Sequence, residues 1–327
     1  MEAWLTVLRG DPLPWLLAKE TPAVRHLALR RLLDEPPDST AVRRARTAAM
    51  RSDPIAAILA AQDEESFFEP RHPWPKYRGP MYSLTFLYQA GADPAHPRVI
   101  RLCEYILDGV PARDGRLGPG VDWQVHCLHG NTLAALIAFG FASDERVRRA
   151  IEWQARAITG EGVLSWPLGR TTGLGFACGC NSGLSCAWGA IKALLAFALI
   201  APAERSPVVQ RAIDQGVEFL LSRDPAVADY PAGRQGKISP LWFRLGFPFG
   251  YVADLLQNLE ALVAVGSARD ARLGNAIDFI VSRQDAQGHW RNDNAYERRT
   301  WAPFDNTHST SKWVTLRACT VLRAALG

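Results

Sequence analysis

Residues 274–290 of the chain are Gly-Asn-Ala-Ile-Asp-Phe-Ile-Val-Ser-Arg-Gln-Asp-Ala-Gln-Gly-His-Trp. Their first half repeats apolar side chains at intervals of three and four residues, which predicts one buried helix face: Ile277, Ile280 and Val281. Gln284 stands at the end of this helix, and Gly288 and Trp290 form the turn that follows. A helix that ends in this way suggests a structural unit that the chain repeats.

The helix pattern recurs along the sequence as an apolar residue or Cys, then an acid, then an aromatic residue. The copies begin at Cys103, Ile151, Val217 and Ile277, at spacings of 48, 66 and 60 residues. A weaker copy covers residues 55–62, and its Gln62 corresponds to Gln284. These segments predict amphipathic helices with one face in solvent.

A second, more apolar class of helix alternates with the first. Its copies are marked near their starts by a glycine: Gly79, Gly130, Gly189 and Gly250, at spacings of 51, 59 and 61 residues. A last copy without glycine begins near residues 311–313. Two interleaved series with matching periods indicate stacked helical hairpins that bury their faces against one another.

The segment from Gln284 to Trp290 resembles the Gln-Trp repeat of the terpenoid cyclase and protein prenyltransferase superfamily, also called squalene cyclase-like. The resemblance covers about residues 52–325 and implies an all-α fold, an (α/α) toroid of about five helical-hairpin repeats. The inner ring would then be the more apolar helices and the outer ring the amphipathic ones. Residues 1–51 differ and predict an N-terminal helical cap, with 52–327 forming one continuous toroid domain.

Composition narrows the class of protein. The chain has 327 residues, 48% of them hydrophobic, and a formal net charge of +4, which gives no indication of nucleic-acid binding. The N-terminus lacks the basic-then-apolar order of a signal peptide, and the longest uncharged apolar run, residues 193–203, is too short to cross a bilayer. Six cysteines without a leader favour a cytoplasmic protein with reduced thiols.

The cysteines give the most specific functional prediction. Cys127 and Cys186 stand at the same position in successive inner helices, three residues before the marker glycine. Because inner helices of a toroid begin side by side at one end, we expect these two thiols to lie close together. Cys178 and Cys180 come just before the second of these helices, and His308 comes just before the last one.

Three thiolates and one imidazole form a common zinc site, which predicts zinc as a cofactor. The candidate ligands are Cys127, Cys178, Cys180, Cys186 and His308. A helix N-terminus also favours the thiolate, so such a site could activate a thiol or a water molecule. Protein prenyltransferases and lanthionine synthetase cyclases, of the same fold class, use zinc in this way, but their ligands do not map onto this chain residue by residue. The alternative is that the cysteines pack as small hydrophobic residues.

Acids and aromatics supply further candidates. Neither the Asp-x-Asp-Asp motif of proton-initiated cyclases nor an Asp-Asp-x-x-Asp motif for magnesium occurs in the sequence. Asp254 and Asp305 are therefore the candidate catalytic acids, although an acid at Asp254 also suits the start of a helix. Candidate substrate-binding aromatics, which could equally be core residues, are Trp74, Tyr82, Trp242, Phe247, Tyr251 and Trp313.

The leading hypothesis is an enzyme that holds a hydrophobic, prenyl- or lipid-like substrate in a central cavity, with a Cys/His zinc site at one end. The apolar segment 241–251 would line that cavity or contact a membrane surface where the substrate enters. Two alternatives remain open: a metal-free terpenoid-binding or cyclase-like protein that uses an unrecognised acid, and a non-catalytic toroid that binds a protein or peptide.

Overall fold

The computed structural model describes residues 3–64, 67–68, 75–109, 115–117, 125–161, 173–233 and 236–327. The α-helices are α1 (Leu13–Leu16), α2 (Pro22–Leu32), α3 (Thr40–Met50), α4 (Ile55–Ala60), α5 (Pro80–Gln89), α6 (Pro97–Gly109), α7 (His126–Leu136), α8 (Glu145–Thr159), α9 (Ala187–Phe197), α10 (Pro207–Leu221), α11 (Leu255–Ala264), α12 (Gly274–Ser282) and α13 (Lys312–Leu326). Within these described ranges, the strands are one short antiparallel pair, β1 (Trp290–Arg291) and β2 (Thr310–Ser311). The fold is all-α, as predicted.

Short helical turns connect these elements. The 3₁₀ turns are η1 (Ala3–Val7), η2 (Ala61–Asp63), η4 (Leu174–Phe176), η5 (Gly179–Asn181), η6 (Pro202–Glu204), η7 (Pro240–Phe243) and η8 (Ala271–Leu273), and a π-helical turn, η3 (Ile137–Phe141), extends α7. None of the described helices is long and apolar enough to span a lipid bilayer.

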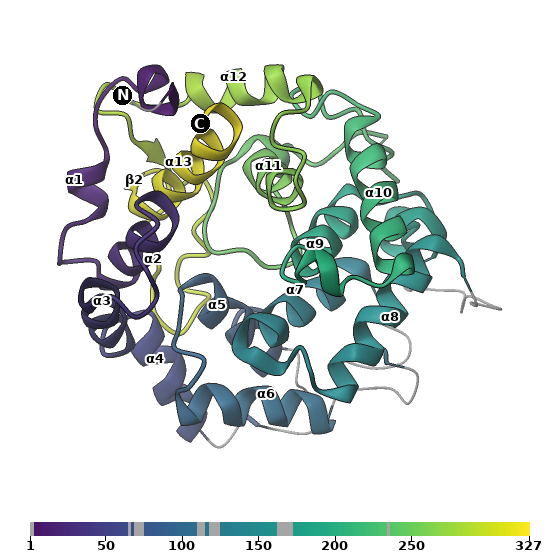
Figure 1. The fold of residues 1–327 in the computed structure, drawn as a ribbon, viewed down its shortest axis with the longest axis horizontal. Coiled ribbons are helices and arrows are strands. Elements are labelled where there is room, and N and C mark those ends of the chain that lie inside the picture. Colours follow the sequence, from purple (N-terminus) through teal and green to yellow (C-terminus); the bar gives the residue numbers. More distant parts are fainter. Residues whose placement is uncertain are drawn as a thin grey trace.

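The helices form two concentric rings (Figure 1). Inner helices α5, α7, α9, α11 and α13 contact one another in that order, and α4, α6, α8, α10 and α12 alternate with them along the chain on the outside. The prediction of an (α/α) toroid of about five hairpin repeats is therefore confirmed. The inner helices are also the more apolar ones, because both of their sides face protein: the first eight residues of α5 are all buried.

The outer helices owe their bounds to local signals. At the start of α8, the Asp144 side chain accepts a hydrogen bond of 2.8 Å from the backbone N–H of Arg146, so it caps the helix. At its end, Gly160 adopts φ 83°, a left-handed conformation that glycine takes without strain. Between these caps, Val147 and Ala150 are buried while the charged residues face outward.

The Gln-Trp segment ties distant parts of the chain together. Gln284 Nε2 donates to the carbonyl of Val7 at 3.0 Å, and its Oε1 accepts from the backbone N–H of Arg9 at 2.7 Å. Trp290 is buried, and its indole N–H donates to the carbonyl of Ile280 in α12 at 2.7 Å. Gln62 repeats the arrangement, since its amide donates at 3.1 Å to the carbonyl of Arg98 in α6.

The N-terminal segment lies between the first and the last hairpins. Helix α3 contacts α4, whereas α2 packs against α13, the last helix of the inner ring. Arg323 of α13 reaches Asp34 and also donates to the carbonyl of Arg31 at 3.0 Å. The two ends of the chain are therefore joined, and Figure 1 shows both termini on the same side of the ring.

Helix α11 begins later than the glycine series predicts. Gly250 is not at its start; the helix begins at Leu255, where the Asp254 side chain accepts from the backbone N–H of Gln257 at 2.7 Å. The preceding segment 246–250 instead passes inside the ring. We refer to this segment as the plug.

The plug bonds to several inner helices. Gln89 of α5 pairs with both the N–H and the carbonyl of Phe249, and Asn131 of α7 donates to the carbonyl of Gly250 at 2.8 Å. The Phe249 ring lies 4.0 Å from the guanidinium carbon of Arg317 in α13 and 5.0 Å from Nζ of Lys192 in α9. The inside of the ring, predicted as a central cavity, thus contains the chain's own residues.

Candidate functional site

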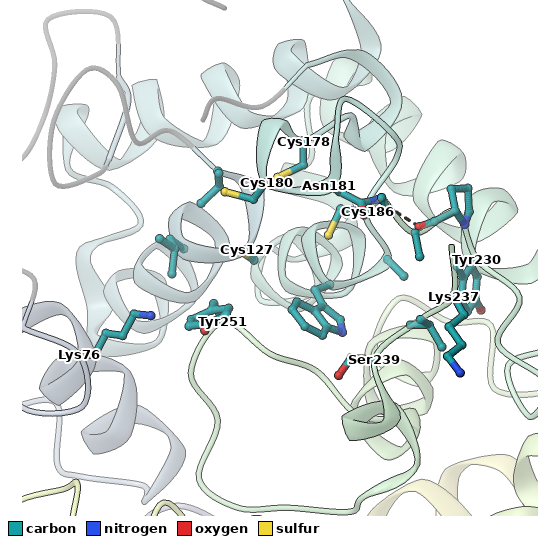
Figure 2. A pocket seen from close by; sticks show the side chains of 18 of the residues that line it. Lys76, Cys127, Cys178, Cys180, Asn181, Cys186, Tyr230, Lys237, Ser239 and Tyr251 are labelled. Atoms are coloured by element: carbon teal, nitrogen blue, oxygen red, sulfur yellow. Dashed lines mark hydrogen bonds between the residues drawn. The ribbon is translucent and has the colours of Figure 1, made fainter. Parts of the chain in front are cut away.

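A pocket lies where the inner helices α5, α7 and α9 begin. Its volume is about 580 Å³, which suits a small molecule. Its walls come from the starts of these helices, from the segment before α9, from residues 230–233 and 237–239, and from Tyr251, which follows the plug. All four cysteines of the predicted metal site line it: Cys127, Cys178, Cys180 and Cys186 (Figure 2).

Close packing of α7 against α9 brings these thiols together. A side chain at Gly130 of α7 would lie 2.6 Å from the backbone of Lys192 in α9, and one at Gly189 would lie 3.1 Å from His126. The small residues therefore let the two backbones approach, and this approach places Cys127 and Cys186 at a common wall. Comparison of the inner helices in the sequence had predicted this proximity.

Cys178 and Cys186 come from one short hairpin. Ala177 and Ser185 form an antiparallel bridge, with hydrogen bonds from the N–H of Cys178 to Leu184 and from the N–H of Cys186 to Phe176. Because side chains alternate across a strand, the two cysteines project on the same face of this hairpin. In this pairing Cys178 is opposite Leu184 and Cys186 is opposite Phe176, so the two cysteines are diagonal neighbours on that face.

The surroundings of Cys127 and Cys178 raise the pKa of both thiols. Burial raises the pKa of Cys127 to about 12, and the hydrogen bond with Cys186, together with burial, raises the pKa of Cys178. The sequence predicted the opposite direction for Cys127 from its place at a helix start, but loss of water outweighs the helix dipole there. At neutral pH these two thiols therefore carry their protons.

The predicted zinc set does not fit this arrangement. His308 lies away from the pocket, on the loop before β2, where its Nδ1 is 3.7 Å from an oxygen of Asp293. Across the part of the chain that the structure describes, no three His, Cys, Asp or Glu side chains form a group that could hold a metal ion. The imidazoles nearest the thiols, His126 and His129, are buried, and burial lowers the pKa of His126 to about 3.

Aromatic side chains and two lysines form the rest of the wall. Tyr82, Trp188 and Tyr251 line the pocket, and the rings of Trp188 and Tyr251 lie 6.2 Å apart between centroids. Lys76 and Lys237 are exposed at its edge, on opposite sides in Figure 2, and Nζ of Lys76 is 5.1 Å from the centre of the Tyr251 ring. The described lining residues include no Asp or Glu.

One hydrogen-bond donor in this wall is unsatisfied. The indole Nε1 of Trp188 is buried and has no acceptor among the described residues. A buried donor without an acceptor costs about 1–3 kcal/mol. This N–H is enclosed in the wall, so the pocket itself offers two cations, Lys76 and Lys237, to a molecule that binds in it.

Not all the predicted aromatics reach this pocket. Tyr82 and Tyr251 line it, whereas Trp242, Phe247 and Trp313 are buried elsewhere. Phe247 stacks on Trp313 at 4.5 Å between ring centroids, and Trp242 donates to the carbonyl of Pro225 at 2.9 Å. Trp74 lies outside the described residues. Since most of segment 241–251 is buried, it also offers no apolar surface to a membrane.

Neither candidate acid lines the pocket. Asp254 caps α11, and its carboxylate also accepts from the N–H of Gly246 at 2.8 Å and from Arg317 at 3.2 Å. Asp305 accepts from the N–H of Asn306 at 3.0 Å, and burial raises its pKa. Both acids have local structural partners and stand apart from the thiols.

Lys192 is a buried titratable residue outside the site predicted from the sequence. It is 1% exposed in the middle of α9, where its amine donates to Oε1 of Gln257. Burial lowers its pKa to about 7, with a smaller opposing influence from Cys127. A signal was present in the sequence, because Lys192 is the one charged residue between Cys186 and Ala203.

Comparisons with known proteins add little to this description. No family model and no curated protein matches the chain. Among solved structures, the chain is similar to a variant of the type II terpene cyclase MstE from Scytonema in complex with geranylgeranyl dihydroxybenzoate, with 13% identity, a TM-score of 0.46 and coverage of 94% of this chain and 87% of that one. It is also similar to apo MstE, with 14% identity, a TM-score of 0.29 and coverage of 83% and 95%. These similarities are weak, so the description of the pocket depends on the structure of this chain.

Proposed function

We propose that the chain is an enzyme that binds a hydrophobic, prenyl- or lipid-like molecule with an anionic head group in the pocket at the start of α7 and α9. The observation that carries this proposal is the lining itself. It combines aromatic walls and thiols with two lysines, and its described part has no carboxylate. An apolar body suits the aromatic rings, and an anion suits the lysines.

Head-group recognition would use two cations, Lys76 and Lys237, which stand at the rim. Exposed cations attract an anion, and because salt screens them, their contribution to binding should fall as the ionic strength rises.

For the chemical step, the groups within reach are the thiols. Cys127 and Cys178 are protonated at neutral pH, and Cys186 is half-buried beside them. We assign no carboxylic acid to proton donation, because Asp254 and Asp305 lie outside the pocket. The chemistry we propose for this wall is the addition of a thiol across a carbon–carbon double bond of the substrate, in which the S–H bond and the π bond break and a C–S and a C–H bond form.

The test compares two probes that share the geranylgeranyl group. Geranylgeranyl diphosphate and geranylgeraniol differ in the anionic head group, so we expect the diphosphate to bind at least about tenfold more tightly, a difference of roughly 1.4 kcal/mol. Calorimetric titration measures both affinities. Lys237→Glu should weaken binding of the diphosphate and leave binding of the alcohol unchanged. Trp188→Ala should weaken binding of both probes.

Lys19→Glu is the matched control, because Lys19 is exposed and does not line the pocket, so it makes the same change in net charge elsewhere. Equal binding of the two probes, or equal losses in the Lys19 and Lys237 variants, would contradict the proposed head-group site. Mass spectrometry of the incubated probe checks for conversion. A product that is lost in Cys127→Ser with affinity retained would support the proposed thiol chemistry.

A further inference from the structure

A second, much smaller space lies next to the pocket, between α5 and α7. Its volume is about 10 Å³, which is roughly the space that one water molecule needs. Its walls are Met81, Tyr82 and Thr85 of α5 and Leu128, Asn131 and Thr132 of α7. Tyr82 and Leu128 also line the pocket, so these two side chains lie between the two spaces.

We propose that Tyr82 and Leu128 set the depth of the pocket, and with it the longest hydrophobic chain that the pocket accepts. Truncation of either side chain would join the inner space to the pocket and admit a longer chain. This inference rests on the proposed function and deepens it, because it assigns selection for chain length to two residues of the same site.

The Tyr82 ring is held in place from several sides. It is 3% exposed in the first turn of α5, and its centroid lies 5.5 Å from that of Tyr77 and 5.8 Å from that of Phe86. A methyl group at Gly250 of the plug would lie only 2.8 Å from the ring. Because the ring is packed in this way, it cannot turn aside for a ligand without displacing its neighbours.

Leu128 forms the other half of this barrier. It is 7% exposed in α7 and packs in a hydrophobic cluster with Cys127 and Cys178, against which Trp188 lies. Helix α7 contacts α5 on one side and α9 on the other, so its position is fixed by both neighbours. The barrier therefore consists of two side chains on facing helices, and each can be removed without the other.

The hydrogen-bond donors around the inner space have partners of their own. The hydroxyls of Thr85 and Thr132 donate to backbone carbonyls of their own helices at 2.9 and 3.1 Å, and the Asn131 amide donates to the plug at 2.8 Å. Since these donors are occupied, the space favours an apolar group over a polar one. The far end of a prenyl chain whose head group lies at Lys76 and Lys237 is such a group.

Binding of a series of prenyl diphosphates to the full-length protein tests the proposal. The series runs from geranyl to hexaprenyl diphosphate in steps of one isoprene unit, and calorimetric titration finds the length that the wild type binds most tightly. The quantity compared is the affinity for the next longer probe divided by the affinity for this optimum. We expect this ratio to rise at least about tenfold in Tyr82→Ala and in Leu128→Ala, because the added unit can then be buried. Tyr82→Phe keeps the ring and should keep the wild-type ratio.

Tyr88→Ala is the matched control, because it removes the same ring from the same helix at a residue that lines neither space. Leu128→Ala decides the question if Tyr82→Ala does not fold. An unchanged ratio in either folded variant, or an equal rise in Tyr88→Ala, would overturn the inference while the proposed function stands. If the wild type binds no member of the series, the proposed function itself is wrong, and the inference falls with it.

Discussion

Lys192 shows how one residue inside the ring can respond to pH. Its amine is enclosed by α9, Gln257 of α11 and the Phe249 ring of the plug, with the Arg317 guanidinium on the same ring. Asp254 and Glu260 favour the charged amine, yet loss of water outweighs them and lowers its pKa from 10.5 to about 7. The folded protein therefore releases this proton at a pH where the unfolded chain still binds it.

This difference predicts a pH-dependent stability. Below pH 7 Lys192 is charged in both states, and the folded state bears the full cost of the buried charge. Between about pH 7 and 10.5 only the unfolded chain holds the proton, so the free energy of unfolding rises with pH, by at most about 1.4 kcal/mol per pH unit. Urea unfolding at pH 6.5, 8 and 9.5 should show that the free energy of unfolding of the wild type, relative to that of Lys192→Met, increases as the pH rises.

Subtracting the variant removes the titration of other groups, because both proteins contain the same thiols and tyrosines. The lost hydrogen bond to Gln257 should add a constant offset. If the difference between the two proteins does not change with pH, Lys192 keeps its ordinary pKa.

At the residue scale, sequence alignment of repeats predicted some site residues and missed others for physical reasons. Cys127 and Cys186 follow from equivalent positions in successive helices, and equivalent positions are neighbours in a ring. His308 precedes the last inner helix, but its place on the β2 loop depends on backbone pairing that the periodicity does not contain. Phe247 and Trp242 are aromatic residues of the kind that line binding surfaces, and only their packing shows that they are core residues.

At the scale of elements, the contact between α7 and α9 positions the pocket wall. The glycine series near the inner helix starts has its explanation here, because a methyl group at Gly130 would lie 2.6 Å from the Lys192 backbone. A backbone atom on a packed helix cannot move aside as a flexible side chain can. The glycine is needed for close approach of the two helices.

Gly130→Ala should therefore lower the free energy of unfolding by about 1–3 kcal/mol, although alanine is the better helix former by about 1 kcal/mol. Thermal unfolding followed by circular dichroism measures the loss. Gly274→Ala in α12 is the matched control, since a side chain there meets nothing within 4 Å, and it should be neutral or slightly stabilising. Equal melting temperatures for the two variants would show that the backbone of α9 shifts to accommodate the added methyl group, contrary to the prediction.

Most elements were predictable because their signals are local. The acid and aromatic pattern identified the outer helices α6, α8, α10 and α12. The start of α11 was wrong by five residues, because Gly250 resembles the other marker glycines while the plug bonds to Gln89 and Asn131 on distant helices. The sequence pattern alone does not show that hydrogen bonds to distant helices determine where α11 begins; the three-dimensional structure does.

At the scale of the whole molecule, the ring closes by contacts between the two ends of the chain. Helix α2 packs on α13, and Gln284 holds residues 7–9 through three hydrogen bonds, one of them from the Arg9 guanidinium to its own carbonyl at 2.8 Å. The Gln-Trp segment was informative in sequence because this amide has defined backbone partners. Those partners lie about 275 residues away and could not be named from the sequence.

Gln284→Ala should loosen the N-terminal segment more than the rest of the protein. It removes the acceptor of the Arg9 N–H and the donor to the Val7 carbonyl, at a cost of about 1–3 kcal/mol. Amide hydrogen exchange should increase over residues 3–12 and little in α7 or α9. Gln287→Ala, at an exposed position, is the control; similar exchange in both variants would exclude closure through this amide.

The plug has a consequence for how a ligand enters and leaves the pocket. Residues 246–250 bond to α5, α7 and α13, so within the part of the chain that the structure describes they lie across the interior of the ring. If the pocket binds a substrate as proposed, the product would leave by the opening through which the substrate entered. Entry and exit would then use a single opening, so accumulating product would compete with substrate for it and inhibit turnover.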